Sequence, residues 1–232
     1  MGVAFMKVVS LFSGGKDSAF ALWCAQAQGW DVESLVTVFP ESKDSWMFHF
    51  PAIRWTKLQA EAIGIPHTII HTKGEKETEL EDLSNGLEKL KSSGIEGIVS
   101  GAIASEYQKT RLDNLCERLG LKSYAPLWHK NQEQLVREQI ESGFEIIVTA
   151  CNALGLDAKW LGRKLGTKEL EALVKLKKRY GLNVALEGGE AETFVLRAPM
   201  FKRRLTVVRS TPHWHGESGY LDLEEIRLET PV

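Results

Sequence analysis

The sequence has few cysteines, no long apolar run and almost no net charge. Its three cysteines are Cys24, Cys116 and Cys151. This odd number contains no CxxC pair, so neither a disulfide framework nor a zinc knuckle is supported, and we expect a reducing, cytoplasmic environment. No apolar stretch approaches the ~20 residues that a membrane-spanning helix needs. A formal net charge of −2 over 232 residues gives no overall attraction to nucleic acid or to anionic membranes.

The informative segment is residues 13–18, Ser-Gly-Gly-Lys-Asp-Ser, which follows an apolar run at 7–12. Two adjacent glycines allow a tight turn whose N–H groups meet an anion, and a following helix adds partial positive charge. A Walker A loop would need Gly at position 10 and Ser or Thr at position 17, where this chain has Ser10 and Asp17. Since a carboxylate beside a triphosphate repels it unless Mg²⁺ intervenes, the segment predicts a phosphate loop of another kind.

Strand and helix patterns alternate through the first half of the chain. We expect strands at residues 7–12, 34–39, 67–71 and 97–101, and helices at residues 18–28, 52–64, 75–93 and 106–119. Nearly continuous apolar strands separated by helices indicate a parallel sheet that is buried on both faces. In such a sheet the ligand lies beyond the carboxyl ends of the strands, where loops 13–18, 40–51 and 101–106 would gather.

The pattern changes after Pro126. We expect helices at 131–142 and 167–180, and strands at 145–150, 204–211 and 220–228, with turn residues including Pro212 between the last two. The predicted fold is therefore α/β: a parallel-sheet nucleotide-binding domain at residues 1–125, followed by a smaller α/β subdomain at residues 126–232.

A second motif carries three carboxylates around a glycine turn. Glu187, Glu190 and Glu192 fall within six residues, next to Gly188 and Gly189. Neighbouring carboxylates repel and raise one another's pKa values, so they are favoured where a cation, a metal or a transferred proton is expected. A solvated acidic turn is the simpler interpretation, but the apolar residues on both sides favour a site.

The segment at 13–18 resembles the SGGxDS signature of the PP-loop ATP pyrophosphatases. Five further motifs extend the resemblance: SWMFH at 45–49, SEYQKTR at 105–111, PLW at 126–128, WLGR at 160–163 and EGGEAET at 187–193. In this order they resemble the diphthine–ammonia ligase (diphthamide synthase) family over nearly the whole chain. The sequence departs from the family pattern at Ala102, usually Asp, and at Ala191, often Tyr.

The resemblance implies a PP-loop, HUP-like Rossmannoid first domain and an ATP-dependent ligase. Such an enzyme converts the carboxylate of diphthine on translation elongation factor 2 to an amide with ammonium, through an acyl-adenylate, and releases AMP and pyrophosphate. ATP and Mg²⁺ are the implied cofactors, and no stable nucleic-acid or membrane partner is expected. A homodimer is a further expectation, to which no particular residue points.

We expect ATP to be bound by the phosphate loop and by a histidine of the next loop: Ser13, Gly14, Gly15, Lys16, Asp17, Ser18 and His49. We expect the acceptor to be bound by Tyr107, Gln108, Arg111, Trp128, Glu187, Gly188, Gly189, Glu190 and Thr193. The expected catalytic residues are Lys16, Asp17, Glu190 and Glu192. Lys16 would offset charge on the leaving pyrophosphate, and Asp17 would act through Mg²⁺ bound with ATP.

The acidic motif has two interpretations. Glu190 or Glu192 could attract ammonium and accept its proton. The same carboxylates, together with an aromatic face such as that of Trp128, could instead receive the trimethylammonium group of diphthine.

Two other functions remain open. A tRNA-modifying PP-loop enzyme would be expected to carry paired redox cysteines or an attached RNA-binding domain. A non-catalytic adenine-nucleotide sensor would need the phosphate loop but not the three glutamates.

Overall fold

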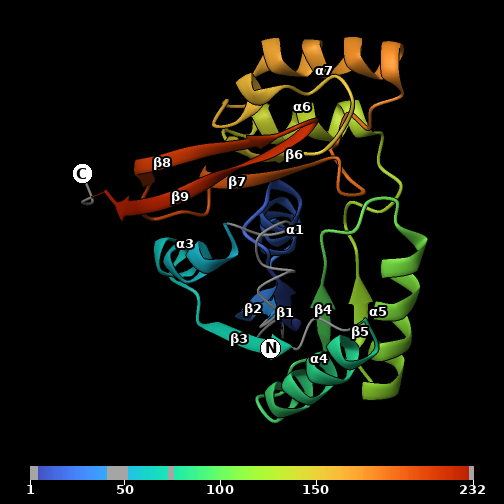
Figure 1. Ribbon diagram of the computed structural model, residues 1–232. Helices are drawn as coiled ribbons and strands as arrows, with labels where there is room; N and C mark the ends of the chain where they lie inside the picture. The colour runs from blue at the N-terminus through green and yellow to red at the C-terminus, as the bar shows by residue number, and fades with distance from the viewer. Residues whose placement is uncertain (1–4, 41–51, 73–75, 230–232) are drawn as a thin grey trace. The chain divides into compact units, whose positions relative to one another are not determined.

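The computed structural model describes residues 5–40, 52–72 and 76–229 (Figure 1). Backbone contacts divide these residues into two units. The first contains residues 5–13, 17–40 and 65–128, apart from 73–75, and the second contains residues 14–16, 52–64 and 129–229. The domain boundary expected between residues 125 and 126 stays a prediction.

The first unit is built on a five-stranded parallel sheet of order β3-β2-β1-β4-β5, as the sequence predicts. Its strands are β1 (Lys7–Leu11), β2 (Asp31–Pro40), β3 (His67–Thr72), β4 (Gly97–Val99) and β5 (Lys122–Tyr124), and its helices are α1 (Lys16–Ala27), α4 (Lys76–Lys91) and α5 (Glu106–Leu119). The sheet grows from β1 in both directions, so right-handed crossovers place α1 on one face and α4 and α5 on the other.

The core of this unit lies between the sheet and the pair α4 and α5, which Figure 1 shows side by side. Buried leucines of α4 and α5 pack there against valine and isoleucine side chains of the central strands. The sequence determines where α5 starts and stops: Ser105 Oγ accepts the N–H of Gln108 at 3.4 Å, and Gly120 adopts the left-handed conformation at the helix end.

The second unit contains a four-stranded antiparallel sheet of order β7-β6-β9-β8. Its strands are β6 (Glu145–Cys151), β7 (Ala191–Arg197), β8 (Leu205–His215) and β9 (Ser218–Leu228), and its helical elements are η1 (Ile53–Trp55), α3 (Thr56–Ile63), α6 (Gln132–Glu141), η2 (Ala158–Trp160) and α7 (Thr167–Tyr180). Figure 1 shows α6 and α7 together above one face of this sheet.

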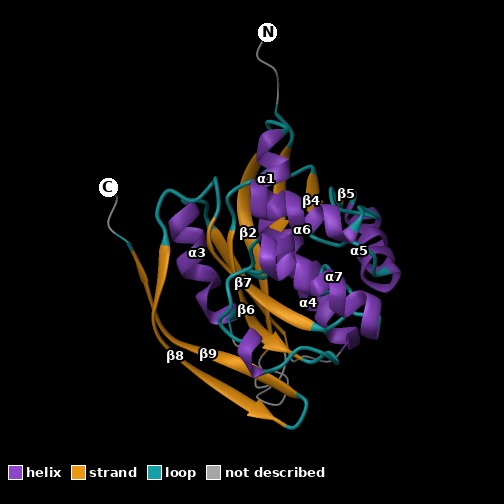
Figure 2. Cartoon of the chain, turned by 90° about the horizontal axis from the view of Figure 1, so that it is seen from above, coloured by secondary structure: helices purple, strands orange, loops and turns teal. Residues whose placement is uncertain are grey.

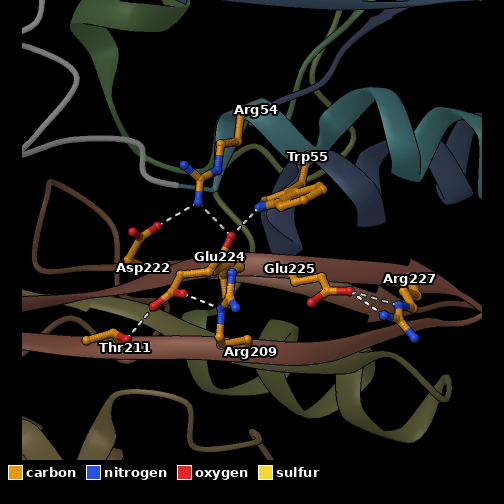
Figure 3. A network of polar contacts seen from close by, with 9 residues as sticks. Arg54, Trp55, Arg209, Thr211, Asp222, Glu224, Glu225 and Arg227 are labelled. Carbon is orange, nitrogen blue, oxygen red and sulfur yellow. Dashed lines mark hydrogen bonds and ion pairs between the residues drawn. The ribbon is translucent and has the colours of Figure 1, made fainter.

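The short helices η1 and α3 pack on apolar side chains of this antiparallel sheet. Arg54 fixes this position because its guanidinium donates to Asp222 Oδ1 at 2.6 Å and to the carbonyl oxygen of Leu223 at 2.7 Å (Figure 3). The indole N–H of Trp55 donates to the same carbonyl at 2.7 Å. A segment far from the sheet in sequence is therefore attached to its β9 strand.

Three expectations about local structure need correction. The first helix begins at Lys16 rather than at residue 18, so half of the phosphate motif lies in its first turn. Strands β5 and β7 were not expected, because β5 has only three residues and β7 starts inside the acidic motif. Pro212 lies within β8, an edge strand that tolerates proline, and the β8–β9 hairpin turns instead at Gly216 (Figure 2).

Candidate active site

The phosphate loop leaves β1 and enters α1 through a compact turn. The N–H of Ser13 donates to Ser18 Oγ at 3.2 Å, and the two serine hydroxyls are also 3.2 Å apart. Gly14 adopts a φ of +81°, a conformation that glycine reaches without strain. The loop is therefore closed by its own first and last serines.

Asp17 and Ser18 approach the end of β4 closely. A Cβ atom added to Gly101 would lie 2.7 Å from the N atom of Ser18 and 2.8 Å from the carbonyl carbon of Asp17. The absence of a side chain at Gly101 thus lets the loop after β4 meet the first turn of α1. This agrees with the expected gathering of loops 13–18 and 101–106 at the carboxyl end of the sheet.

Residues 14–16 of the loop belong to the second unit and are bonded within it. The backbone N–H of Lys16 donates to Thr193 Oγ1 at 3.2 Å, and both residues are buried. This bond joins the Ser-Gly-Gly-Lys-Asp-Ser motif to the acidic motif, across 177 positions in the sequence. Two of the predicted site segments are therefore brought into direct contact.

The carbonyl oxygen of Gly14 accepts two further bonds from this unit. It accepts the N–H of Val195, in the edge strand β7, at 3.1 Å. It also accepts the side-chain amide of Gln59, in α3, at 3.0 Å. Sequence reasoning missed Gln59, because a single polar residue in a helix belongs to no motif.

The acidic motif forms a tight turn before β7. Leu186, Gly188 and Gly189 have φ angles of +58°, +72° and +82°. A Cβ atom at Gly188 or Gly189 would meet nothing within 4 Å, so the backbone conformation rather than crowding favours glycine at both positions.

Glu190 has a defined structural contact in this turn. One carboxylate oxygen accepts the N–H of Asn183 at 2.7 Å, and the main-chain carbonyl accepts the N–H of Asn152 at 2.8 Å. The side chain of Asn152 also donates to the carbonyl oxygen of Gly189 at 3.0 Å. The carboxylate of Glu190 therefore stabilises the turn, whatever else it does.

Glu192 and Thr193 are consecutive in β7, so their side chains extend to opposite faces of the strand. Glu192 shares its face with Phe194, a member of the core formed with η1 and α3. Thr193 uses the other face, and its hydroxyl reaches the phosphate loop. Glu187 and Glu192 are both half-buried.

The acceptor residues expected in the first unit form two small clusters. The Arg111 guanidinium lies 4.8 Å from the centre of the exposed Tyr107 ring and donates to its hydroxyl. Lys109 Nζ lies 5.8 Å from the centre of the half-buried Trp128 ring. Gln108, in the first turn of α5, is exposed. Their roles in acceptor binding stay predictions.

His49 and the motif at 45–49 lie outside the described residues. Among the described residues, no group of three or more His, Cys, Asp or Glu side chains could hold a metal ion. Nor does the described part of the chain contain a helix long and apolar enough to cross a membrane.

The cysteines give no support to thiol chemistry. Burial raises the pKa of the Cys116 thiol to about 11 and that of the Cys151 thiol to about 12. Neither thiol is appreciably ionised at neutral pH, and the thiolate is the reactive form. Cys24 is half-buried in α1 and forms no disulfide. The structure therefore does not favour the pair of reactive cysteines that a sulfur-transferring PP-loop enzyme would be expected to carry.

Comparison with known proteins identifies the family. Residues 6–123 match the family described as diphthamide synthase N-terminal domain, and residues 131–228 match the diphthamide synthase C-terminal domain. The chain is 38% identical over 244 residues to diphthine–ammonia ligase of Rattus norvegicus, covering 96% of this chain and 91% of that protein. It is 37% identical over 253 residues to the Homo sapiens enzyme of the same name, covering 98% and 94%. For the Schizosaccharomyces pombe enzyme the identity is 35% over 246 residues, covering 97% of this chain but 40% of that longer protein. The chain belongs to the diphthamide synthase family.

Proposed function

We propose that this protein is an ATP-dependent amide ligase that converts diphthine on translation elongation factor 2 to diphthamide, with ammonium as the nitrogen donor. Family membership supports this proposal. The observation that carries it is the hydrogen bond from the Lys16 N–H to Thr193, which attaches the phosphate loop directly to the strand that follows the acidic turn. An enzyme that activates a carboxylate and then amidates it needs both features close together.

In the first step the diphthine carboxylate attacks the α-phosphorus of ATP, and the bond to pyrophosphate breaks. This gives an acyl-adenylate, whose AMP is a far better leaving group than oxide. Residues 13–18 and the N-terminus of α1 would hold the phosphates, and Lys16 would offset the charge that develops on pyrophosphate. His49 would complete the nucleotide site. Asp17 would hold Mg²⁺ together with the ATP phosphates, and a single carboxylate suits an ion that usually keeps phosphate and water ligands.

In the second step ammonium loses a proton, ammonia attacks the acyl carbon, and AMP leaves. Glu190 or Glu192 would attract the cation and accept its proton. The acceptor would be held by Glu187 with its glycine turn, by Thr193, and by the α5 side chains Tyr107, Gln108 and Arg111. Trp128 offers an aromatic face to the trimethylammonium group.

Nucleotide product analysis tests the proposal. The protein is incubated with ATP, Mg²⁺ and ammonium, with and without elongation factor 2 that carries diphthine. We expect AMP and pyrophosphate to form only with the diphthine-bearing factor, and the factor to gain an amide. Bound but unreacted ATP would instead identify a nucleotide sensor, and AMP formed only with tRNA would identify a tRNA-modifying enzyme.

A further inference from the structure

Gln59 is a buried polar side chain that the proposed chemistry does not use. It lies in α3 and is 0% exposed. Its Nε2 donates to the carbonyl oxygens of Gly14, at 3.0 Å, and of Val195, at 2.8 Å. A single amide group thus connects a helix, the phosphate loop and the edge of the antiparallel sheet.

The two acceptors fix the orientation of this amide. If the group were turned by 180°, Oε1 would face two carbonyl oxygens, and three partial negative charges would meet in a buried space. In the observed orientation Oε1 has no hydrogen-bond partner within the described residues. It packs against Gly14, where an added Cβ atom would overlap it. A buried acceptor without a donor lowers the free energy of unfolding, so the glutamine at position 59 is not explained by stability alone.

The geometry of the peptide bond gives Gln59 its effect on the loop. The Gly14 carbonyl and the Gly15 N–H belong to one planar trans peptide, so they point in opposite directions. The carbonyl is held by the Gln59 amide and by the N–H of Val195. These two donors therefore fix the direction of the Gly14 carbonyl, and through the planar peptide they favour the opposite direction for the Gly15 N–H.

We infer that Gln59 is a positioning residue for nucleotide binding: it orients the Gly14–Gly15 peptide so that the N–H side of the phosphate loop faces the ligand phosphates. This inference rests on the proposed function, in which residues 13–18 hold ATP. Without Gln59 the Gly14 carbonyl oxygen loses the amide donor and keeps the N–H of Val195, so the orientation of the peptide is less firmly fixed. The affinity for ATP then falls by roughly tenfold, the usual effect of losing one buried hydrogen bond.

The chain supplies a matched control, because Gln139 in α6 is also 0% exposed and lies outside the proposed site. Gln59→Met and Gln139→Met are compared by direct ATP titration, by the KM values for ATP and ammonium, and by thermal unfolding. We expect Gln59→Met to raise the Kd and KM for ATP about tenfold while the KM for ammonium changes less than about twofold. Gln139→Met should lower the unfolding midpoint and leave ATP affinity intact. An unchanged ATP Kd in Gln59→Met, or an equal rise in both variants, would overturn the inference.

Gln59→Glu provides a second test if the methionine variant does not fold. Its ionised carboxylate cannot donate to either carbonyl, whereas the protonated acid can donate one O–H. We expect its ATP Kd to approach that of the parent protein as the pH is lowered from about 8 to about 5, relative to Gln139→Glu at each pH. A constant Kd ratio across this range contradicts a positioning role. ATP titration needs no protein substrate, so a parent protein that binds ATP but forms no AMP would refute the ligase proposal and leave the Gln59 comparison valid.

Discussion

Glu190 has a structural contact that can be separated from its proposed catalytic role. Its carboxylate accepts the Asn183 N–H at 2.7 Å, and a hydrogen bond to a charged group contributes about 1.5–3 kcal/mol. Glu190→Ala removes the acceptor and leaves that N–H to water or to no partner. At ~1.4 kcal/mol per factor of ten, the hydrogen-exchange protection of the Asn183 amide should fall roughly 10- to 100-fold. Glu190→Gln keeps a carbonyl oxygen in place, so its effect should be several times smaller.

The catalytic role is tested with the same glutamine variant. If Glu190 accepts the ammonium proton, Glu190→Gln should slow amide formation by about 10²- to 10⁴-fold while adenylation, followed by pyrophosphate release, continues. Equal loss of both partial reactions would refute the proton-acceptor role. Unchanged protection of the Asn183 amide in Glu190→Ala would refute the structural one. Glu187→Gln is the control for the hydrogen-exchange measurement, because the main-chain carbonyl of Glu187, which accepts the Glu190 N–H, is unchanged by this substitution.

Three further predictions concern buried and ionised groups. Thr193→Val removes the acceptor of the buried Lys16 N–H and should lower the free energy of unfolding, measured with denaturant, by about 1–3 kcal/mol. In the same measurement Thr149→Val should be neutral or stabilising, because it replaces a buried hydroxyl that has no partner in the described structure. Burial raises the thiol pKa of Cys116 to about 11 and that of Cys151 to about 12, so roughly one thiol in a thousand or fewer is ionised at pH 8. Both should therefore resist iodoacetamide in the native protein, as measured by mass spectrometry, and rapid labelling of either would contradict this. Burial raises the pKa of Glu145, but bonds from Lys164 and Arg204 outweigh this and lower it below its ordinary value of 4.5. Its stabilising contribution is therefore present above pH 4.5 and lost as the pH falls through the lowered pKa, and Glu145→Gln should flatten the acid limb of a stability–pH curve.

The sequence was sufficient to predict the parallel sheet and the strand–loop–helix at residues 7–27, because these depend on apolar runs and glycines that act locally. Gly64 and Gly120 end their helices in the left-handed conformation, where the pattern indicated. The beginning of α1 was predicted two residues late. The reason is not local: the N–H of Lys16, the first helical residue, finds its acceptor on Thr193.

The strand that begins inside the acidic motif, β7, could not be predicted from its own residues. Glu192 and Thr193 precede a run of only three apolar residues at 194–196, so the sequence does not indicate a strand here, and β7 forms by pairing with β6. The predicted site residues in 187–190 do form a turn, with both glycines at positive φ. Neither motif, however, contains a signal for Gln59, whose importance depends entirely on which carbonyl oxygens the fold places around it.

The hydrogen bonds of residues 14–16 connect the phosphate loop to the strand that follows the acidic turn. An isolated phosphate loop would be shaped by its glycines alone, and its N–H groups could adopt several directions at little cost. Here Thr193, Val195 and Gln59 help to hold it, and the first two belong to β7, the strand that continues from the acidic turn. The outer edge of β7 is in turn occupied by the loop, which supplies the acceptor that an unpaired edge strand lacks. Each motif therefore completes the backbone hydrogen bonding of the other, and a substitution in β7 acts on the phosphate loop without touching the glycines or Lys16.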